Sequence, residues 1–246
     1  MQTTYFWNKL HLQRYKVVAL LILVLTGFSG FGQKLKWVEK NNPNYDDRKL
    51  TYGFLIGLHT TSYQLKYSDE FINDPKFSNL HSVTPRWKAG FSLGFIVNYR
   101  LNPVLDLRIT PKVGFYEHEV KYAYTDNTPD ETRLVETTMV ELPLLLKYKS
   151  ERRGNVRMYM IGGVKPAIEA SGQKEREKSE TLEVKTSNFH LEAGFGFDLY
   201  YPLFKFSPEI RFSRGIADIL DDRSNEFGGP LKRVNTNTIT VYFIFQ

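Results

Sequence analysis

The feature of this 246-residue sequence that most restricts its possible folds is an alternation of apolar and polar residues with a period of two. In Trp87–Tyr99, apolar side chains occupy every second position, and the positions between them hold mainly lysine, glycine, serine and asparagine. Phe189–Tyr201 repeats this pattern. Successive side chains of a β-strand point to opposite faces of the sheet. The alternation therefore predicts strands with one apolar and one polar face.

Six further runs with weaker alternation bring the number of expected strands to eight, an even number as in single-chain bacterial barrels. Long and short connections alternate between them, which is typical of long external loops and short periplasmic turns. The sequence thus predicts an all-β fold, an eight-stranded antiparallel up-and-down transmembrane β-barrel in residues 50–246, with both termini in the periplasm of a Gram-negative cell. The expected strands are 51–67, 87–99, 105–121, 136–149, 157–170, 189–201, 204–213 and 237–245. The expected long connections are 68–85, 123–134, 171–188 and 217–236, and the short ones are 102–104, 150–156 and 202–203.

Such a sheet has to close, because each unpaired backbone N–H or C=O in hydrocarbon costs several kcal/mol and an open sheet has two bare edges. The interior of an eight-stranded barrel is just wide enough to be filled by side chains. Charges of both signs fall on the expected inner face, so we interpret them as a polar network of ion pairs that fills the lumen. Conduction of an ion or a substrate is the alternative. The expected lumen residues are Arg108, Lys112, Glu141, Lys147, Glu192, Asp198, Glu209 and Arg211.

The first 32 residues have the pattern of a cleaved secretory signal peptide. Residues 1–16 are polar with three basic and no acidic side chains, and Val17–Thr26 is apolar. Gly30 and Gly32 suit a cleavage site before Gln33. An uncleaved membrane anchor is the alternative, although the apolar run is short for a bilayer span. Residues 33–49 are expected to form a short, loose periplasmic segment before the barrel.

Composition limits the possible partners. Removal of the leader lowers the formal net charge from +6 to +3, so we do not interpret the basic balance as nucleic-acid binding. Aromatic residues make up 15% of the chain, which suits strands and the interfacial girdles of a barrel. There is no cysteine, which excludes disulfides, thiolate metal sites and a lipidated N-terminal cysteine. Outer-membrane lipid is the expected surrounding.

Enzymatic motifs are weak. None of the five histidines stands in H-x-x-x-H spacing, and there is no G-x-S-x-G elbow. His190 and Glu192 lie two apart on one strand face, and a base with its orienting group could be built this way, with Ser92 or Ser171 as nucleophile. Strand periodicity also produces such neighbours by chance. We therefore predict a non-enzymatic protein with no catalytic residues, no metal and no cofactor.

Two expected loops are rich in charge. Lys174–Glu183 has charges of alternating sign, and residues 217–236 contain an acidic cluster. Each is interpreted as a solvated loop tip into which the neighbouring strands can extend, with a docking surface for a partner as the alternative.

Three segments resemble the PorT-type outer-membrane β-barrel family. They read VELPLLLKY in Val140–Tyr148, RMYMIGG in Arg157–Gly163 and FSPEIRFSRG in Phe206–Gly215. The resemblance covers the chain from about Leu50 to the end. It implies a component of the type IX secretion system that assembles beside a much larger translocon barrel and serves protein export and, in gliding bacteria, gliding motility. A structural or adhesive barrel that acts through its loops, and a lipid-modifying enzyme, are the alternatives.

Overall fold

The computed structural model describes residues 41–125, 129–170, 182, 184–221 and 227–246. The expected leader, its cleavage site and residues 33–40 lie outside the described residues. No helix in the described part of the chain is long and apolar enough to cross a membrane. The short helices are η1 (Tyr45–Asp47), α3 (Glu70–Asn73) and η2 (Pro75–Phe77).

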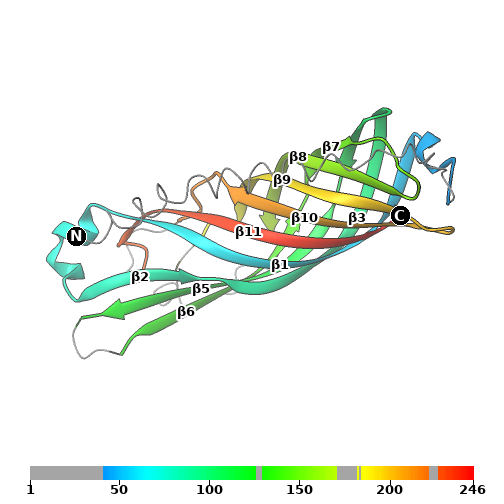
Figure 1. Ribbon diagram of the computed structural model, residues 1–246. Helices are drawn as coiled ribbons and strands as arrows, with labels where there is room; N and C mark the ends of the chain where they lie inside the picture. Colours follow the sequence, from blue (N-terminus) through cyan, green and yellow to red (C-terminus); the bar gives the residue numbers. More distant parts are fainter. Residues whose placement is uncertain (1–40, 126–128, 171–181, 183, 222–226) are drawn as a thin grey trace, which may run out of the picture. The chain divides into compact units, whose positions relative to one another are not determined.

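Antiparallel strands account for most of the described residues (Figure 1). Eleven of them are hydrogen-bonded into one sheet. They are β1 (Leu50–Tyr67), β2 (Leu80–Arg86), β3 (Lys88–Asn102), β4 (Leu105–Ile109), β5 (Lys112–Tyr124), β6 (Glu131–Glu141), β7 (Leu144–Lys149), β8 (Val156–Glu169), β9 (Ser187–Tyr200), β10 (Lys205–Gly215) and β11 (Leu231–Phe245).

The sheet closes on itself. β1 pairs with both β3 and β11, and the β8–β9 pairing joins the two halves of the ring. β4 and β5 both pair with β3 in one continuous register, so together they occupy one position in the ring. β6 and β7 pair with β5 and β4 in one continuous register and also share a position. β2 continues β3 on the other side of Trp87 and pairs with β5. The eleven strands therefore occupy eight positions around the ring. This confirms the predicted all-β, eight-stranded up-and-down barrel.

Two prolines each divide one ring position into two strands, where the sequence analysis expects a single continuous strand. Pro111 separates β4 from β5, and Pro143 lies between β6 and β7. Proline has no backbone N–H, so the hydrogen-bond ladder is interrupted although the register continues.

The two faces of the wall follow the predicted alternation. Tyr52 and Phe95 point outward with 76% and 69% of their surface exposed, whereas Leu55 on β1 and Ile96, which follows Phe95 on β3, are buried. Outward residues are apolar along most of each strand, and inward residues are largely polar or charged. This is the pattern of a wall with hydrocarbon outside.

Strand pairing continues further than the sequence predicts. β2 begins within the expected connection 68–85, β6 begins within 123–134, and β11 begins within 217–236. At the end of the barrel where these connections lie, β1, β2, β5, β6 and β11 extend beyond β9 and β10 (Figure 1). The outward residues of these parts are mainly polar, such as Thr132, Glu136 and Lys232, and so carry little alternation signal. We name this end of the barrel the loop end, and the opposite end, with its short connections, the turn end.

Candidate functional site: the filled lumen

The centre of the lumen is organised around Glu209 on β10. The guanidinium of Arg108, from β4, donates to its Oε2 at 2.6 Å, and the hydroxyl of Tyr159, from β8, donates to the same oxygen at 2.6 Å. Arg211 donates through Nε to the other carboxylate oxygen. All four side chains are buried. One carboxylate thus ties together three different strands across the interior.

Glu141 on β6 forms a second centre. Lys112 and Lys165 place their ammonium groups 2.8 and 2.9 Å from its carboxylate oxygens, and Tyr116 donates its hydroxyl at 2.8 Å. Lys112 also donates to the hydroxyl of Tyr242. The lysines come from β5 and β8, so this carboxylate also joins neighbouring strands.

Asp198 and Glu192 on β9 link these centres to the rest of the interior. Lys147 donates to Asp198 at 2.6 Å, and Ser207 donates to its other oxygen at 2.6 Å. Glu192 lies 3.3 Å from Arg211 and 3.6 Å from Lys165. Since Arg211 also contacts Glu209 and Lys165 also contacts Glu141, the ion pairs of Glu209, Glu192 and Glu141 are connected. The Asp198 pair joins this network through Lys147, whose ammonium lies 3.7 Å from the ring centroid of Tyr159.

The structure brings all eight expected lumen residues, named in the sequence analysis, into this network. Each is at most 4% exposed and lies within 4 Å of an opposite charge. Sequence reasoning missed Lys165, because Gly162, Gly163 and Pro166 obscure the alternation of β8. It also left out the buried Asp106–Lys149 pair at 2.6 Å, although Asp106 falls on the expected polar face. The alternation places Tyr116 and Tyr242 on the inner face of their strands, but their roles as partners of the buried charges had no sequence signal, and Tyr159 lies on a strand of uncertain facing.

A layer of histidine and threonine side chains lies next along the lumen. His190 Nε2 and Thr236 Oγ1 share a hydrogen bond of 2.8 Å, and His118 Nε2 and Thr61 Oγ1 share one of 3.2 Å. The ring of His59 stacks on Tyr116 with centroids 4.3 Å apart.

The alternative catalytic arrangement is not assembled here. His190 contacts Thr236, whereas Glu192 contacts Arg211 and Lys165. Ser92 is completely buried, and Ser171 lies outside the described residues. Among the residues that the structure describes, no group of three histidine, aspartate or glutamate side chains could hold a metal ion.

The loop end is closed by an apolar cluster, which the sequence does not predict. Tyr63 and Val120 lie two residues beyond Thr61 on β1 and His118 on β5, and they point inward like them. Residues from the expected solvated connections 171–188 and 217–236 fold inward onto them, and Tyr122 donates to the carbonyl of Phe227 at 3.0 Å. The interpretation of 217–236 as a solvated loop is therefore wrong for the residues that join this cluster. The charged tip Lys174–Glu183 lies outside the described residues except for Leu182. The cluster consists of Tyr63, Val83, Val120, Tyr122, Leu182, Ile219, Leu220, Phe227, Leu231 and Val234.

The turn end is closed by the segment before β1. Tyr45 is buried, and the carboxylate of Asp46 accepts from Tyr200 at 2.8 Å and lies 3.1 Å from Arg157. Arg152 donates to the carbonyl of Asn42 at 3.0 Å. The described part of the lead-in, residues 41–49, is therefore an ordered plug and not a loose segment. Isolated charges and a tyrosine in a short polar stretch gave no sign of this docking.

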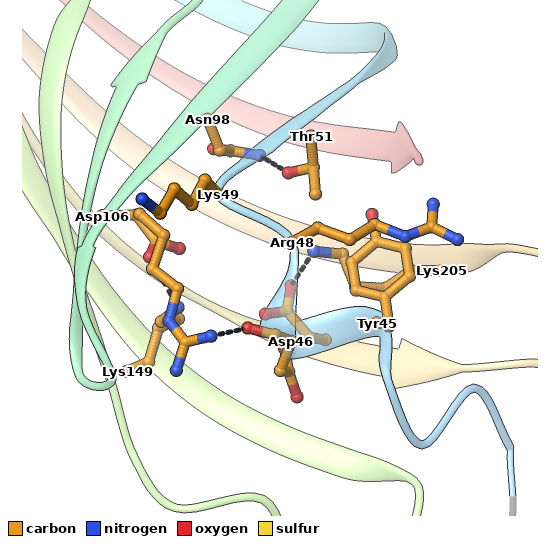
Figure 2. A pocket seen from close by; sticks show the side chains of 11 residues that line it. Tyr45, Asp46, Arg48, Lys49, Thr51, Asn98, Asp106, Lys149 and Lys205 are labelled. Carbon is orange, nitrogen blue, oxygen red and sulfur yellow. Dashed lines mark hydrogen bonds and ion pairs between the residues drawn. The ribbon is translucent and has the colours of Figure 1, made fainter.

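A small opening remains beside this plug. Figure 2 shows Asn98 pointing to Thr51, with a hydrogen bond of 3.3 Å between them. The opening is about 20 Å³, room for roughly one water molecule. Burial raises the pKa of Tyr45 to about 12, and the nearby charge of Asp198 adds to this rise. The phenol therefore stays neutral at physiological pH.

Taken along its axis, the lumen passes from the 41–49 plug through the ion-pair network and the histidine layer to the apolar cluster. Each layer is filled by side chains. Such an interior holds the wall in one register, because a buried charge that loses its partner is costly.

Comparisons with known proteins found one matching family and several solved structures that are similar to the chain. The family described as "Outer membrane protein beta-barrel domain" matches residues 31–221. OprG from Pseudomonas aeruginosa is similar in structure, with a TM-score of 0.45, 13% identity, and coverage of 78% of this chain and 93% of that chain. Neisserial surface protein A has a TM-score of 0.39 at 13% identity, with 80% and 98% covered. Ail, the attachment invasion locus protein of Yersinia pestis, solved in complex with the heparin analogue sucrose octasulfate, has a TM-score of 0.33 at 14% identity, with 80% and 99% covered.

None of the curated proteins compared with the chain matches its sequence. The family match spans most of the chain, from the end of the expected leader into the connection between β10 and β11. The chain therefore belongs to the outer membrane protein beta-barrel domain family and is a β-barrel of the Gram-negative outer membrane.

Proposed function

We propose that this barrel is a non-enzymatic accessory component of the type IX protein secretion system, where it acts through its walls and ends. The observation that carries the proposal is the filled lumen, with an ion-pair network at its centre and a plug at each end. An exported protein has no path through such an interior. A role in export would then be assembly beside a larger barrel that provides the path.

The resemblance to PorT-type barrels supports the choice of this machine. The residues that carry it have a structural use in the lumen: Glu141 and Lys147 belong to the first motif, and Glu209 and Arg211 to the third. A barrel that shares these motifs would share the same filled interior. We further propose that the turn end and both termini face the periplasm, because short connections of such barrels lie on that side.

Deletion of the encoding gene, followed by measurement of protein export, tests the proposal. Type IX cargo should accumulate in the periplasm, and the full-length chain should restore its export. In a gliding host, gliding should be lost and restored in parallel. Export that continues unchanged in the deletion strain would contradict the proposal.

The expected partners are outer-membrane lipid and the larger translocon. Extraction in a mild detergent, followed by affinity purification and mass spectrometry, should recover a very large outer-membrane barrel at near-stoichiometric amounts. Recovery of the chain alone at native abundance would count against the secretion role.

A structural or adhesive barrel is the second candidate, and the extended strands at the loop end favour it. Its outer side carries charged residues such as Arg86, Lys88 and Glu119, with Lys88 and Glu119 2.5 Å apart. Loss of adhesion with intact export would support this candidate. Enzymatic activity abolished by His190→Ala or Glu192→Ala in a folded barrel would instead support a lipid-modifying enzyme.

A further inference from the structure

The buried lysines of the barrel are not equally paired. Five are buried in the part of the chain that the structure describes, and four of them have a carboxylate oxygen within 2.9 Å. The fifth, Lys205 at the start of β10, is only 5% exposed, yet its ion-pair partner Asp198 is 4.0 Å away. Among the described residues, its ammonium finds no acceptor at hydrogen-bond distance. Lys205 therefore lacks the close counter-charge that a buried cation needs.

Asp198 cannot supply the missing charge, because it is already engaged by closer groups. Lys147 donates to one of its oxygens and Ser207 donates to the other, both at 2.6 Å. Lys147 and Lys205 are each buried, and Asp198 is the one carboxylate within 4 Å of both ammonium groups. One positive charge is thus left over at this point of the lumen.

The same surplus is found along the whole interior. Nine basic side chains are buried, whereas five carboxylates are buried and a sixth, Asp46, is partly exposed. These counts cover the described residues alone. The basic residues are Arg108, Lys112, Lys147, Lys149, Arg152, Arg157, Lys165, Lys205 and Arg211, and the buried acids are Asp106, Glu141, Glu192, Asp198 and Glu209. Charge without compensation is costly away from water, so the lumen favours the binding of an anion.

The small opening at the turn end lies beside Lys205. Figure 2 shows Lys205 next to the ring of Tyr45, whose centroid is 4.6 Å from the ammonium nitrogen. Five basic side chains line the opening, namely Arg48, Lys49, Arg100, Lys149 and Lys205, against Asp46, Asp106 and Asp198. Each of these three carboxylates already accepts a hydrogen bond of 2.8 Å or shorter. The surplus charge at the opening is therefore positive, which suits an anion and not a cation.

The size of the opening limits which anion can enter. A volume of about 20 Å³ holds one water molecule or an ion of similar size. Carboxylates, phosphate and sulfate have several heavy atoms and are too large. Chloride is a single atom, slightly larger than a water molecule, and is common in the media that bathe an outer membrane. A water molecule would also fit, but it would leave the positive charge of Lys205 uncompensated.

We propose that the opening binds one chloride ion, held by the ammonium group of Lys205, and that this ion fastens the plug of residues 41–49 to the barrel wall. Arg48 and Lys49 belong to the plug, whereas Lys205 belongs to the wall. Their like charges repel one another across the opening. An anion between them removes this repulsion, so the docked plug is stabilised wherever chloride is present.

Protection of the plug from trypsin tests the proposal on the purified, folded barrel. Cleavage after Arg48 or Lys49 is followed while chloride replaces gluconate at constant ionic strength. Chloride at ten times its dissociation constant should slow cleavage about tenfold, because the released plug leaves no site for the ion. Bromide should protect like chloride, and sulfate should give no protection beyond gluconate. A reference peptide cleaved in each buffer corrects for effects of the anions on trypsin.

A pair of variants assigns the effect to Lys205. Lys205→Met keeps the length of the side chain and removes its charge, so cleavage should become equally fast in chloride and gluconate. Lys232→Met is the control, because Lys232 is an exposed lysine on β11 at the loop end, and this variant should keep the tenfold protection. The electrophoretic mobility of each variant before heating shows whether its barrel is folded.

A measurement on the unaltered protein does not depend on the folding of a variant. Crystals of the barrel grown in bromide should give an anomalous scattering peak in contact with the ammonium of Lys205. Bromide found at exposed lysines alone would be an adventitious ion only and would overturn the proposal. Equal cleavage of the parent protein in chloride and gluconate, or a folded Lys205→Met variant that keeps its chloride dependence, would overturn it as well.

Discussion

The guanidinium of Arg108 on β4 donates to the carboxylate of Glu209 on β10 at 2.6 Å, with both side chains completely shielded from solvent. This contact joins residues from opposite halves of the chain. A charge buried in this way depends on its partner, because removal of one member leaves the other unpaired.

Substitution of Glu209 should therefore be costly. Glu209→Gln leaves Arg108 and Arg211 without their shared carboxylate, and the free energy of unfolding should fall by about 3–5 kcal/mol. Urea unfolding of the barrel in detergent or lipid vesicles, followed by the fluorescence of its tryptophans, measures the change. In the control Glu131→Gln, a partly exposed ion pair with Arg133 is lost, and the change should stay below about 1 kcal/mol. Equal effects of the two substitutions would refute the network as a stabilising element.

The apolar cluster at the loop end should contribute packing energy. Leu220→Ala creates a cavity among buried side chains and should lower the free energy of unfolding of this end by about 2–5 kcal/mol. Leu203→Ala is the matched control, because Leu203 is 94% exposed at the turn end. Limited proteolysis of the loops in intact cells gives the readout. Cleavage that does not increase in Leu220→Ala would show that the cluster does not hold the loops.

Closure of the wall between β1 and β11 can be tested directly, because the chain has no cysteine. Leu58 and Val241 are opposite one another in the register of these strands. Cysteines at both positions should form a disulfide on mild oxidation in isolated outer membranes, seen as a shift in electrophoretic mobility under denaturing conditions. The pair Leu58→Cys with Ile210→Cys should form none, since β10 lies one strand further away.

The plug formed by residues 41–49 should depend on Arg152. This buried guanidinium donates to the carbonyls of Asn41 and Asn42 and lies 3.7 Å from the ring centroid of Tyr200. Arg152→Ala should release the segment, so that trypsin cleaves after Arg48 or Lys49 much faster than in the parent protein. The neighbouring Arg153 is exposed, and Arg153→Ala should leave the cleavage rate unchanged. Resistance to trypsin in both variants would contradict the role of Arg152.

The sequence alone was sufficient to predict the strands of the barrel wall, because the alternation that indicates them lies within each short segment of the chain. A residue such as Phe95 faces lipid and its neighbour Ile96 faces the lumen. Alternate residues of a strand therefore show which face of the wall is turned to lipid. Register and ring order then follow from antiparallel neighbours joined by alternating connections.

The ends of the lumen could not be predicted, because they depend on contacts between distant residues. Tyr45 meets Tyr200 in an edge-to-face arrangement with centroids 5.8 Å apart, and Phe227 packs on Tyr122 in the same manner at 5.2 Å. A single tyrosine or phenylalanine in a polar segment has no periodicity that would indicate its partner. Lys165 was missed for a related reason, since glycine and proline on β8 interrupt the alternation that assigns a face.

The most direct test of the account is the electrical conductance of the purified, folded barrel in a planar lipid bilayer. The filled lumen predicts no stepwise increase in current at applied voltages of either sign, even at high protein concentration, while a porin measured in the same bilayer opens normally. Reproducible, ohmic steps that scale with the amount of this protein would show a continuous aqueous path and would contradict the account.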